Sequence, residues 1–524
     1  MAARARNLFW LLPSELLERI GQNLERNEVA ATFRLVSKAI ASQLRGPEHT
    51  AIRLSQPVPP HAFAAHWLAP GATRGLTLKQ RRRLLSFTAG SGVVANLEVA
   101  VQAAGCTLAY EAMHSASAGQ LASCKWLHGR GCPMEPPPGD EYSGLLAAAM
   151  SGGHRHMRTW LQSLPLSFSD KEREQAAVAR SCDLAALQRT WRPWFHSLAT
   201  RQKVLAAAAG SPTPDWAAKV EWLEANGCPH SGKAAEAAAS VPDGASAAAR
   251  LAWLRGRGYP ISSAAAVAAA RAGNVAAVQY LLAEARAEVE AAPRWQPELW
   301  GVFEAAEAGQ LEVLRVLHAA GVALGAWRLA ECAARGGRLH VLAWLVEALG
   351  EAAAVLEQGW VLLAAAAQSG SVEALAWLRA RGCAFSGVCV PAAARSGCEA
   401  ALEWLLERGC PMPAGGWEAY VAACGQGDLA MAAYLRRLGV PWGPQGTVFG
   451  ELVSGAPPAV LRWLLEEGCP VGDYGAARRE LRRRQEVVGE RGCAEALTAL
   501  ERREEEEEEE RRGREAAVGV DART

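Results

Sequence analysis

Along most of the chain, apolar residues recur three and four positions apart, which is the spacing of one face of a helix. The segment 392–407, AAARSGCEAALEWLLE, is typical: a glycine separates two short apolar runs. Alternation of apolar and polar residues, the signal of a strand, is scarce. The pattern therefore predicts pairs of short helices and an all-α fold.

A tryptophan or tyrosine followed by leucine returns along the chain, mostly 27 to 36 residues after the previous copy. A period of this length is typical of stacked helical hairpins. In the clearest copies, small alanines ahead of this step allow close helix packing, and a glycine turns the chain. The copies are Trp126, Trp160, Trp222, Trp253, Tyr280, Trp344, Trp377, Trp404, Tyr434 and Trp463, with Val316 and Leu317 filling one register. We expect these aromatic residues to lie in a core between repeats.

The second helix of each hairpin ends at a glycine, often followed by cysteine and proline. Glycine enters the left-handed region without steric cost, and proline prevents the helix from continuing. The recurring cysteine is a reactive thiol, a metal ligand or a small apolar plug. Tyr259 and Val440 take the same position elsewhere, and repeats about 10 Å apart place thiols poorly for one zinc ion. The plug is therefore favoured for Cys106, Cys132, Cys228, Cys383, Cys410 and Cys469.

The segments AAAMSGGHRHMRTWLQ (147–162) and AAEAGQLEVLRVLHAAGVAL (305–324) resemble the second half of an ankyrin repeat. The resemblance covers roughly residues 80–475 and implies a solenoid whose concave face and hairpin tips bind other proteins. The family's TPLH opening is absent, and many repeats are shorter than usual. We expect degenerate, nearly all-helical hairpins, irregular near 164–215. Tryptophans in the first helices are candidates for the recognition surface: Trp327, Trp360 and Trp417.

The first 46 residues predict a separate helical hairpin. Pro13 and Ser14 open one helix, and Val29 starts a second helical segment. A hairpin this short cannot bury its apolar surface alone, so it packs on the repeats or on another chain.

Two motifs of this hairpin, LPSELLERI (12–20) and RLVSK (34–38), resemble the two halves of an F-box. Ile40 stands where that family usually has tryptophan. The resemblance implies binding to the Skp-type adaptor of a cullin–RING ubiquitin ligase. The residues that would carry this contact are Leu12, Pro13, Leu16, Ile20, Val36 and Ser37. The alternative is a hairpin that only caps the first repeat.

Composition narrows the classes of function. A formal net charge of +1 gives no general attraction for nucleic acid or anionic membranes, and no apolar run reaches 18 residues. Eight Asp residues and dispersed histidines predict no catalytic, cofactor or metal site; His154 and His156 form the one close histidine pair. Thirteen cysteines without a C-x-x-C pair, in a chain without a recognisable leader, indicate reduced thiols in the cytoplasm or nucleus.

The sequence thus predicts an all-α solenoid of degenerate ankyrin-like hairpins behind an F-box-like module. The expected parts are the module (1–46), a linker (47–79), the repeats (80–475) and a charged helical or disordered tail (476–524). The expected function is a non-catalytic adaptor that links a target protein to a ubiquitin ligase. Two alternatives stay open: an ankyrin scaffold with no ligase role, and a divergent lipid or phosphodiester hydrolase.

Overall fold

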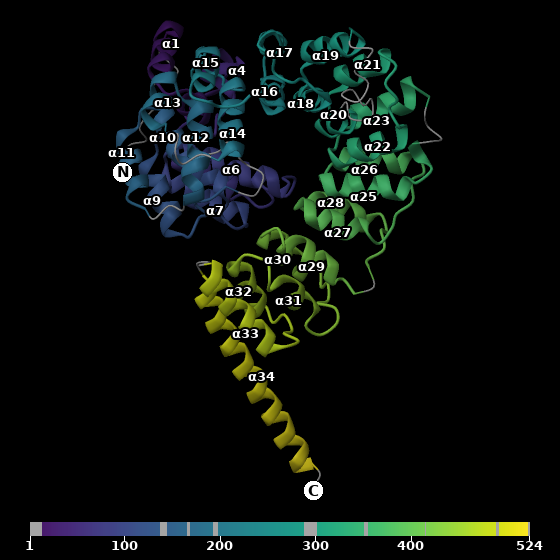
Figure 1. The fold of residues 1–524 in the computed structure, drawn as a ribbon. Coiled ribbons are helices and arrows are strands. Elements are labelled where there is room, and N and C mark those ends of the chain that lie inside the picture. The colour runs from purple at the N-terminus through teal and green to yellow at the C-terminus, as the bar shows by residue number, and fades with distance from the viewer. Residues whose placement is uncertain are drawn as a thin grey trace. The chain divides into compact units, whose positions relative to one another are not determined.

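The computed structural model describes residues 13–136, 144–164, 168–191, 197–287, 301–350, 355–413, 415–488 and 492–521. These residues form helices joined by short turns, and no strand occurs among them (Figure 1). The predicted all-α solenoid is confirmed.

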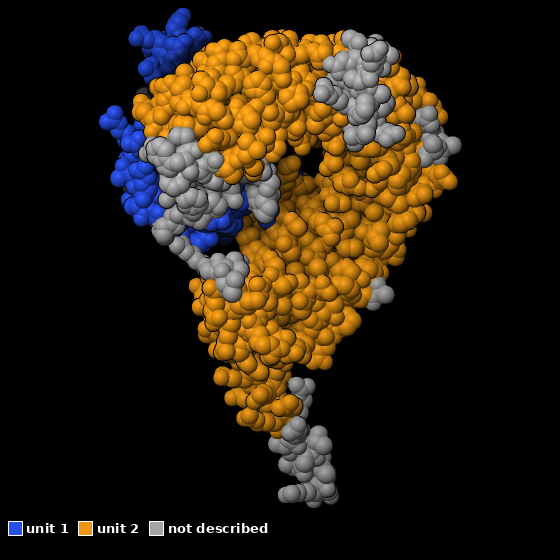
Figure 2. Space-filling view, in the orientation of Figure 1, with its two compact units in different colours: residues 1–73, 80–104, 108–178 blue, residues 74–79, 105–107, 179–524 orange. Residues whose placement is uncertain are grey.

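The chain divides into two compact units (Figure 2). Unit 1 holds residues 1–73, 80–104 and 108–178, and unit 2 holds residues 74–79, 105–107 and 179–524. The two short early segments belong to unit 2 because their backbones bond to late repeats. The N–H of Ala400 donates to the carbonyl of Arg74 at 3.1 Å, and the N–H of Thr107 donates to the carbonyl of Gly427 at 2.9 Å.

Unit 1 begins with the N-terminal hairpin and continues into the first repeats. A buried asparagine, Asn27, donates to the carbonyls of Arg53 and Pro57 at 2.8 and 2.9 Å and so fixes the following loop. The helices that lie wholly or mostly in this unit are α1 (Ser14–Asn23), α2 (Arg26–Ala31), the 3-10 turn η2 (Phe33–Leu35), α3 (Lys38–Gln43), α4 (Pro47–Thr50), α5 (Pro60–Trp67), α6 (Leu78–Ser91), α7 (Val94–Ala104), α8 (Tyr110–Ser117), α9 (Leu121–Gly129), α10 (Leu145–Ser151), α11 (Arg155–Gln162) and α12 (Phe168–Ser181).

Unit 2 continues the array as pairs of first and second helices and ends in a long helix. Its elements are α13 (Leu184–Thr190), α14 (Leu198–Ala209), α15 (Trp216–Ala225), α16 (Gly232–Ala239), α17 (Gly244–Gly256), α18 (Ser263–Ala272), α19 (Val275–Ala287), α20 (Val302–Ala308), α21 (Leu311–Ala319), α22 (Ala326–Arg335), α23 (Leu339–Ala343), the π-helical turn η6 (Trp344–Ala348), α25 (Gly359–Ser369), α26 (Val372–Ala380), α27 (Cys389–Ser396), α28 (Glu399–Glu407), α29 (Trp417–Cys424), α30 (Leu429–Arg437), α31 (Thr447–Leu452), α32 (Pro458–Glu466), α33 (Tyr474–Arg483), the π-helical turn η7 (Arg484–Val488) and α34 (Cys493–Asp521).

The repeats of unit 2 stack through their first helices, in the order α20, α22, α25, α27, α29 and α31. Alanines make this close approach possible: Ala393 and Ala394 of α27 are fully buried. Leucines of the second helices, such as Leu402 and Leu405 of α28, fill the space behind them and are also fully buried. One continuous core therefore runs along the unit, as a repeat array requires.

The glycine after each second helix adopts the predicted left-handed conformation. Gly409 has φ +77°, and a Cβ placed on it would meet no atom within 4 Å. The glycine is therefore required by its backbone angle and not by crowding.

The aromatic step matches the prediction of a buried core position in part: Trp344 and Tyr434 are buried in the core. Its leucines are buried, but Trp253, Trp377 and Trp404 are only half-buried. An arginine four residues later covers each ring; the Arg381 guanidinium lies 3.6 Å from the Trp377 ring centroid. At these three positions the tryptophan ring lies at the edge of the core, and the arginine covers its outer face in a cation–π contact.

Candidate partner-binding surfaces

The N-terminal hairpin has a small core of its own. Its buried residues are Leu17, Val29, Phe33, Ile40 and Leu44, with Ile20 and Leu24 packed against them. The segments that carry the two motifs meet here: a Cβ on Gly21, just after the first motif, would lie 3.9 Å from the ring of Phe33, just before the second. Ile40, which occupies the family's tryptophan position, is fully buried and serves the hairpin interior.

A second set of apolar residues on this hairpin points to solvent. Leu16 is 42% exposed, Leu35 69% and Val36 37%. Because the core beside them is already filled, burial inside the hairpin does not account for these side chains. Leu16 lies on α1 and Leu35 and Val36 lie at the end of η2, so both motif-bearing segments expose apolar side chains.

The six residues expected to bind the adaptor therefore differ in exposure and in structural role. Leu16, Val36 and Pro13 are exposed, whereas Ile20 is half-buried against the core. Ser37 has a local structural role, since its hydroxyl accepts a hydrogen bond from the N–H of Ile40 at 3.2 Å and caps α3. Leu12 lies outside the described residues. The sequence did not select Leu35, although its place in the RLVSK motif was a signal that could have identified it.

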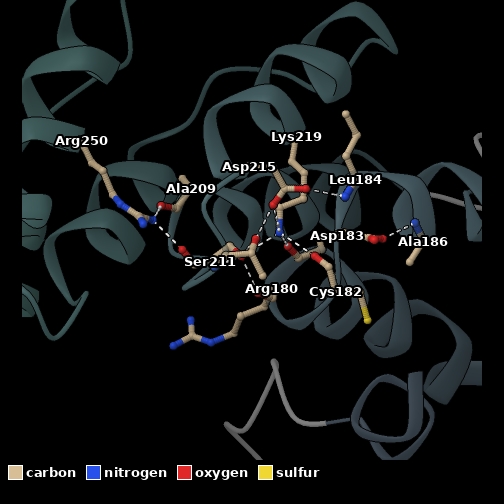
Figure 3. Close-up of polar contacts among 12 residues, drawn as sticks. Arg180, Cys182, Asp183, Leu184, Ala186, Ala209, Ser211, Asp215, Lys219 and Arg250 are labelled. Carbon is tan, nitrogen blue, oxygen red and sulfur yellow. Dashed lines mark hydrogen bonds and ion pairs between the residues drawn. The ribbon is translucent and has the colours of Figure 1, made fainter. Parts of the chain in front are cut away.

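One titratable group in the repeats with a strongly lowered pKa is Lys219, which is fully buried (Figure 3). Its ammonium donates to the carbonyls of Ala179 and Cys182 at 2.7 and 2.9 Å and to the Ser211 hydroxyl at 2.7 Å. Burial lowers the pKa of Lys219 to about 8, and the carboxylate of Asp215, 3.9 Å away, opposes that shift.

Asp215 completes this cluster by bonding to neighbouring donors. It accepts from the Thr213 hydroxyl at 2.5 Å and from the N–H of Leu184 at 2.7 Å. Burial raises the pKa of the Asp215 carboxyl, but these hydrogen bonds and the charge of Lys219 outweigh burial and lower it. A buried lysine beside a carboxylate is a frequent catalytic arrangement. The residues that bind the corresponding carbonyls in other repeats indicate whether Lys219 has such a role or a structural one.

The comparison with other repeats assigns Lys219 a structural role. In the next repeat, Arg250 donates to the carbonyls of Ala209 and Ser211, both at 2.8 Å (Figure 3). Asn274 donates to the carbonyls of Ala239 and Val241, and near the end of the array Arg484 donates to those of Val453 and Ala456. Each buried donor satisfies carbonyls at the end of the preceding first helix. Lys219 is therefore one of a series of inter-repeat clamps.

The cysteines after glycine are buried, as the plug interpretation requires. Cys410 is 5% exposed and its thiol lies 3.6 Å from the carbonyl oxygen of Ser386. Burial raises the pKa of Cys228 to about 11 and that of Cys469 to about 12, so these thiols stay protonated near neutral pH. One contact was not foreseen: the thiol of Cys410 interacts with that of Cys389, which begins α27, the first helix of the same repeat.

A groove of about 470 Å³ lies on the first helices α22, α25, α27 and α29. Its floor is apolar and its edges carry Glu331, Arg335, Arg395 and Glu418. Trp417, one of the three tryptophans considered for the recognition surface, lines it. Trp360 at the start of α25 is 48% exposed, and Trp327 is half-buried.

Two further properties of the described residues concern metal binding and membrane insertion. No group of three or more His, Cys, Asp or Glu side chains in them is arranged to hold a metal ion. None of the described helices combines the length and the apolar character needed to span a membrane.

No protein-family model and no curated protein matches this chain. Among solved structures it is similar to the pentatricopeptide repeat protein PPR10 from maize, with 16% identity and a TM-score of 0.28. The match covers 91% of this chain but 66% of that one, just under two thirds of its length. The chain is an α-helical repeat protein with an apolar N-terminal surface and a groove on its first helices.

Proposed function

We propose that this protein is a non-catalytic adaptor that brings a target protein to a cullin–RING ubiquitin ligase. Its N-terminal hairpin binds the Skp-type adaptor of the ligase, and its ankyrin-like repeats bind the target. The observation that carries the proposal is the exposed group Leu16, Leu35 and Val36 on a hairpin whose own core is filled. These residues belong to the two motifs that resemble an F-box.

The test is co-purification of the full-length protein with a Skp-type adaptor. The structure improves the choice of variants: Leu16→Asp with Leu35→Asp removes the exposed apolar surface, whereas Ile20→Asp would also disturb the core. Gln22→Asp, an exposed polar change on the same helix α1, is the matched control. We expect the wild type and Gln22→Asp to retain the adaptor and the double variant to lose it. Equal recovery of the adaptor with all three would contradict the ligase assignment.

The scaffold alternative makes a different prediction for the same module. If the hairpin only caps the repeats, deleting residues 1–46 lowers the melting temperature and leaves every partner interaction intact. If the hairpin is the ligase-binding part, the deletion removes adaptor binding while target binding by the repeats persists. The hydrolase alternative expects clustered acidic residues and histidines in a pocket, and the lining of the groove contains no histidine.

A further inference from the structure

The groove is built from equivalent positions of successive first helices. Six positions before the turning glycines at 337, 370, 397 and 427 stand Glu331, Ala364, Pro391 and Val421. One position further on, the groove is lined by alanine in three repeats. The floor, which we call the alanine floor, consists of Ala364, Ala365, Pro391, Ala392, Val421 and Ala422. Small side chains in adjacent repeats leave an open channel that runs along the array.

The charged residues at the edges of the groove are not all paired. Glu331 and Arg335 form an ion pair one turn apart on α22. Glu418 lies in the first turn of α29, where the helix dipole stabilises a negative charge. One of its carboxylate oxygens is buried and accepts no hydrogen bond in the described part of the protein. Water or a donor from a ligand can satisfy an acceptor of this kind, and a cationic donor gains most from the negative charge.

The same face continues on both sides of the groove with acidic residues. Glu304 and Glu307 of α20 take the positions of Ala365 and Gln368, and Glu451 of α31 takes the position of Ala422. All three are exposed, and among the described residues none of them forms an ion pair with a cation. This face carries fewer cations than carboxylates. Arg335 pairs with Glu331 and Arg328 stacks on the Phe303 ring at 5.1 Å, so Arg395 is the remaining cation on the first helices α20 to α31.

We propose that this face of the first helices binds an extended, basic segment of a partner protein. The segment places small apolar side chains on the alanine floor and a lysine or arginine against Glu418. This inference rests on the proposed function, since it names the chemistry of the target. Repeats are about 10 Å apart and an extended chain advances about 3.3 Å per residue. Glu451 also lies about one helical turn further along its helix than Glu418, and side chains of an extended segment alternate, so a second basic residue four positions along the segment would face Glu451.

The charge of the face argues against nucleic acid as the occupant. A phosphate backbone needs a row of unpaired cations, and affinity rises with the number of phosphates neutralised. Here Arg395 is flanked by Glu418 and the Glu331–Arg335 pair, so a polyanion meets repulsion along most of the channel.

The test uses the full-length protein and a phage-displayed library of random twelve-residue peptides. Peptides selected on the wild type are expected to carry lysine or arginine next to small apolar residues. Their dissociation constants should rise about tenfold or more with Glu418→Lys, and binding should be lost with Ala392→Trp, which fills the floor. Glu373→Lys is the matched control, because Glu373 is also the second residue of its helix, α26, and lies outside the groove.

Three outcomes would overturn the inference. The selected peptides lack basic residues, they bind Glu418→Lys as tightly as the wild type, or no peptide binds the wild type better than Ala392→Trp. Binding of a single-stranded oligonucleotide that depends on Arg395 would also overturn it. Thermal melts of each variant separate loss of binding from loss of folding. Failure here leaves adaptor binding by the N-terminal hairpin untouched, because that assay uses Leu16 and Leu35 and no groove residue.

Discussion

The ammonium group of Lys219 lies 2.7 Å from the hydroxyl oxygen of Ser211, in a site closed to solvent. The same hydroxyl donates to the carbonyl of Arg180 at 2.6 Å. Two repeats are joined through this pair, and the clamp recurs as Arg250 one repeat later. Carbonyl and hydroxyl oxygens bind the buried ammonium of Lys219, whereas the carboxylate of Asp215 lies 3.9 Å away.

Removing the clamp at Lys219 should destabilise unit 2. Lys219→Met leaves the carbonyls of Ala179 and Cys182 buried without their donor, at a cost of about 2–3 kcal/mol in the free energy of unfolding. Urea denaturation followed by circular dichroism measures this loss. Lys233→Met, at an exposed position of α16, should change the free energy by less than about 0.5 kcal/mol. Similar losses in both variants would contradict the clamp.

The lowered pKa of Lys219 predicts a pH dependence of stability. Its pKa is about 8 in the folded protein and 10.5 ordinarily, so between these values the unfolded chain binds more protons. The unfolding free energy attributable to Lys219 therefore rises from pH 8 to pH 10.5 and is constant below pH 8. Buried cysteines and tyrosines titrate in the same range with the opposite sign, so the readout is the wild type minus Lys219→Met. A difference that is flat across this range would contradict the assignment.

The turn after α28 should tolerate changes at Cys410 better than at Gly409. Gly409→Val forces a β-branched residue to φ +77°, which costs about 2 kcal/mol, whereas asparagine tolerates that region and should cost less. Cys410→Ala removes one buried atom and should cost about 1 kcal/mol. Thermal melting of the three variants measures the order of their stabilities. Equal costs for valine and asparagine would show that crowding, and not the backbone angle, selects glycine.

Two adjacent leucines of α1 should behave oppositely. Leu17 is 4% exposed and belongs to the hairpin core, so Leu17→Asp should open the hairpin and speed amide hydrogen exchange across residues 14–43. Leu16 is 42% exposed, so Leu16→Asp should leave exchange unchanged. If Leu16→Asp also opened the hairpin, the loss of adaptor binding could not be assigned to a surface contact.

The periodicity of the sequence predicted the helical hairpins, their turning glycines and the buried cysteine positions correctly. These features depend on local rules: the helical spacing of leucine and alanine, the left-handed angle at Gly409 and the small volume available at Cys410. The same rules failed for Trp377 and Trp404, because periodicity shows which face of a helix is apolar but not how deeply a large ring enters. The ring lies at the edge of the core, where Arg381 and Arg408 cover it.

The candidate sites were predicted less completely. The F-box-like motifs located the hairpin, but a motif does not distinguish Leu16 from Leu17, which face solvent and core respectively. The clamp at Lys219 and the groove beside Glu418 gave no local signal. Lys219 meets its partners 8, 37 and 40 residues away, and the groove combines four helices spread over about 90 residues.

The sequence by itself determined the repeat, the helix ends and the all-α class, because these follow from interactions between residues a few positions apart. The tertiary structure decided which leucines remain exposed, which charges are buried and where small side chains align into a channel. Those properties depend on which surfaces meet when hairpins stack, and stacking brings together residues that no single repeat contains.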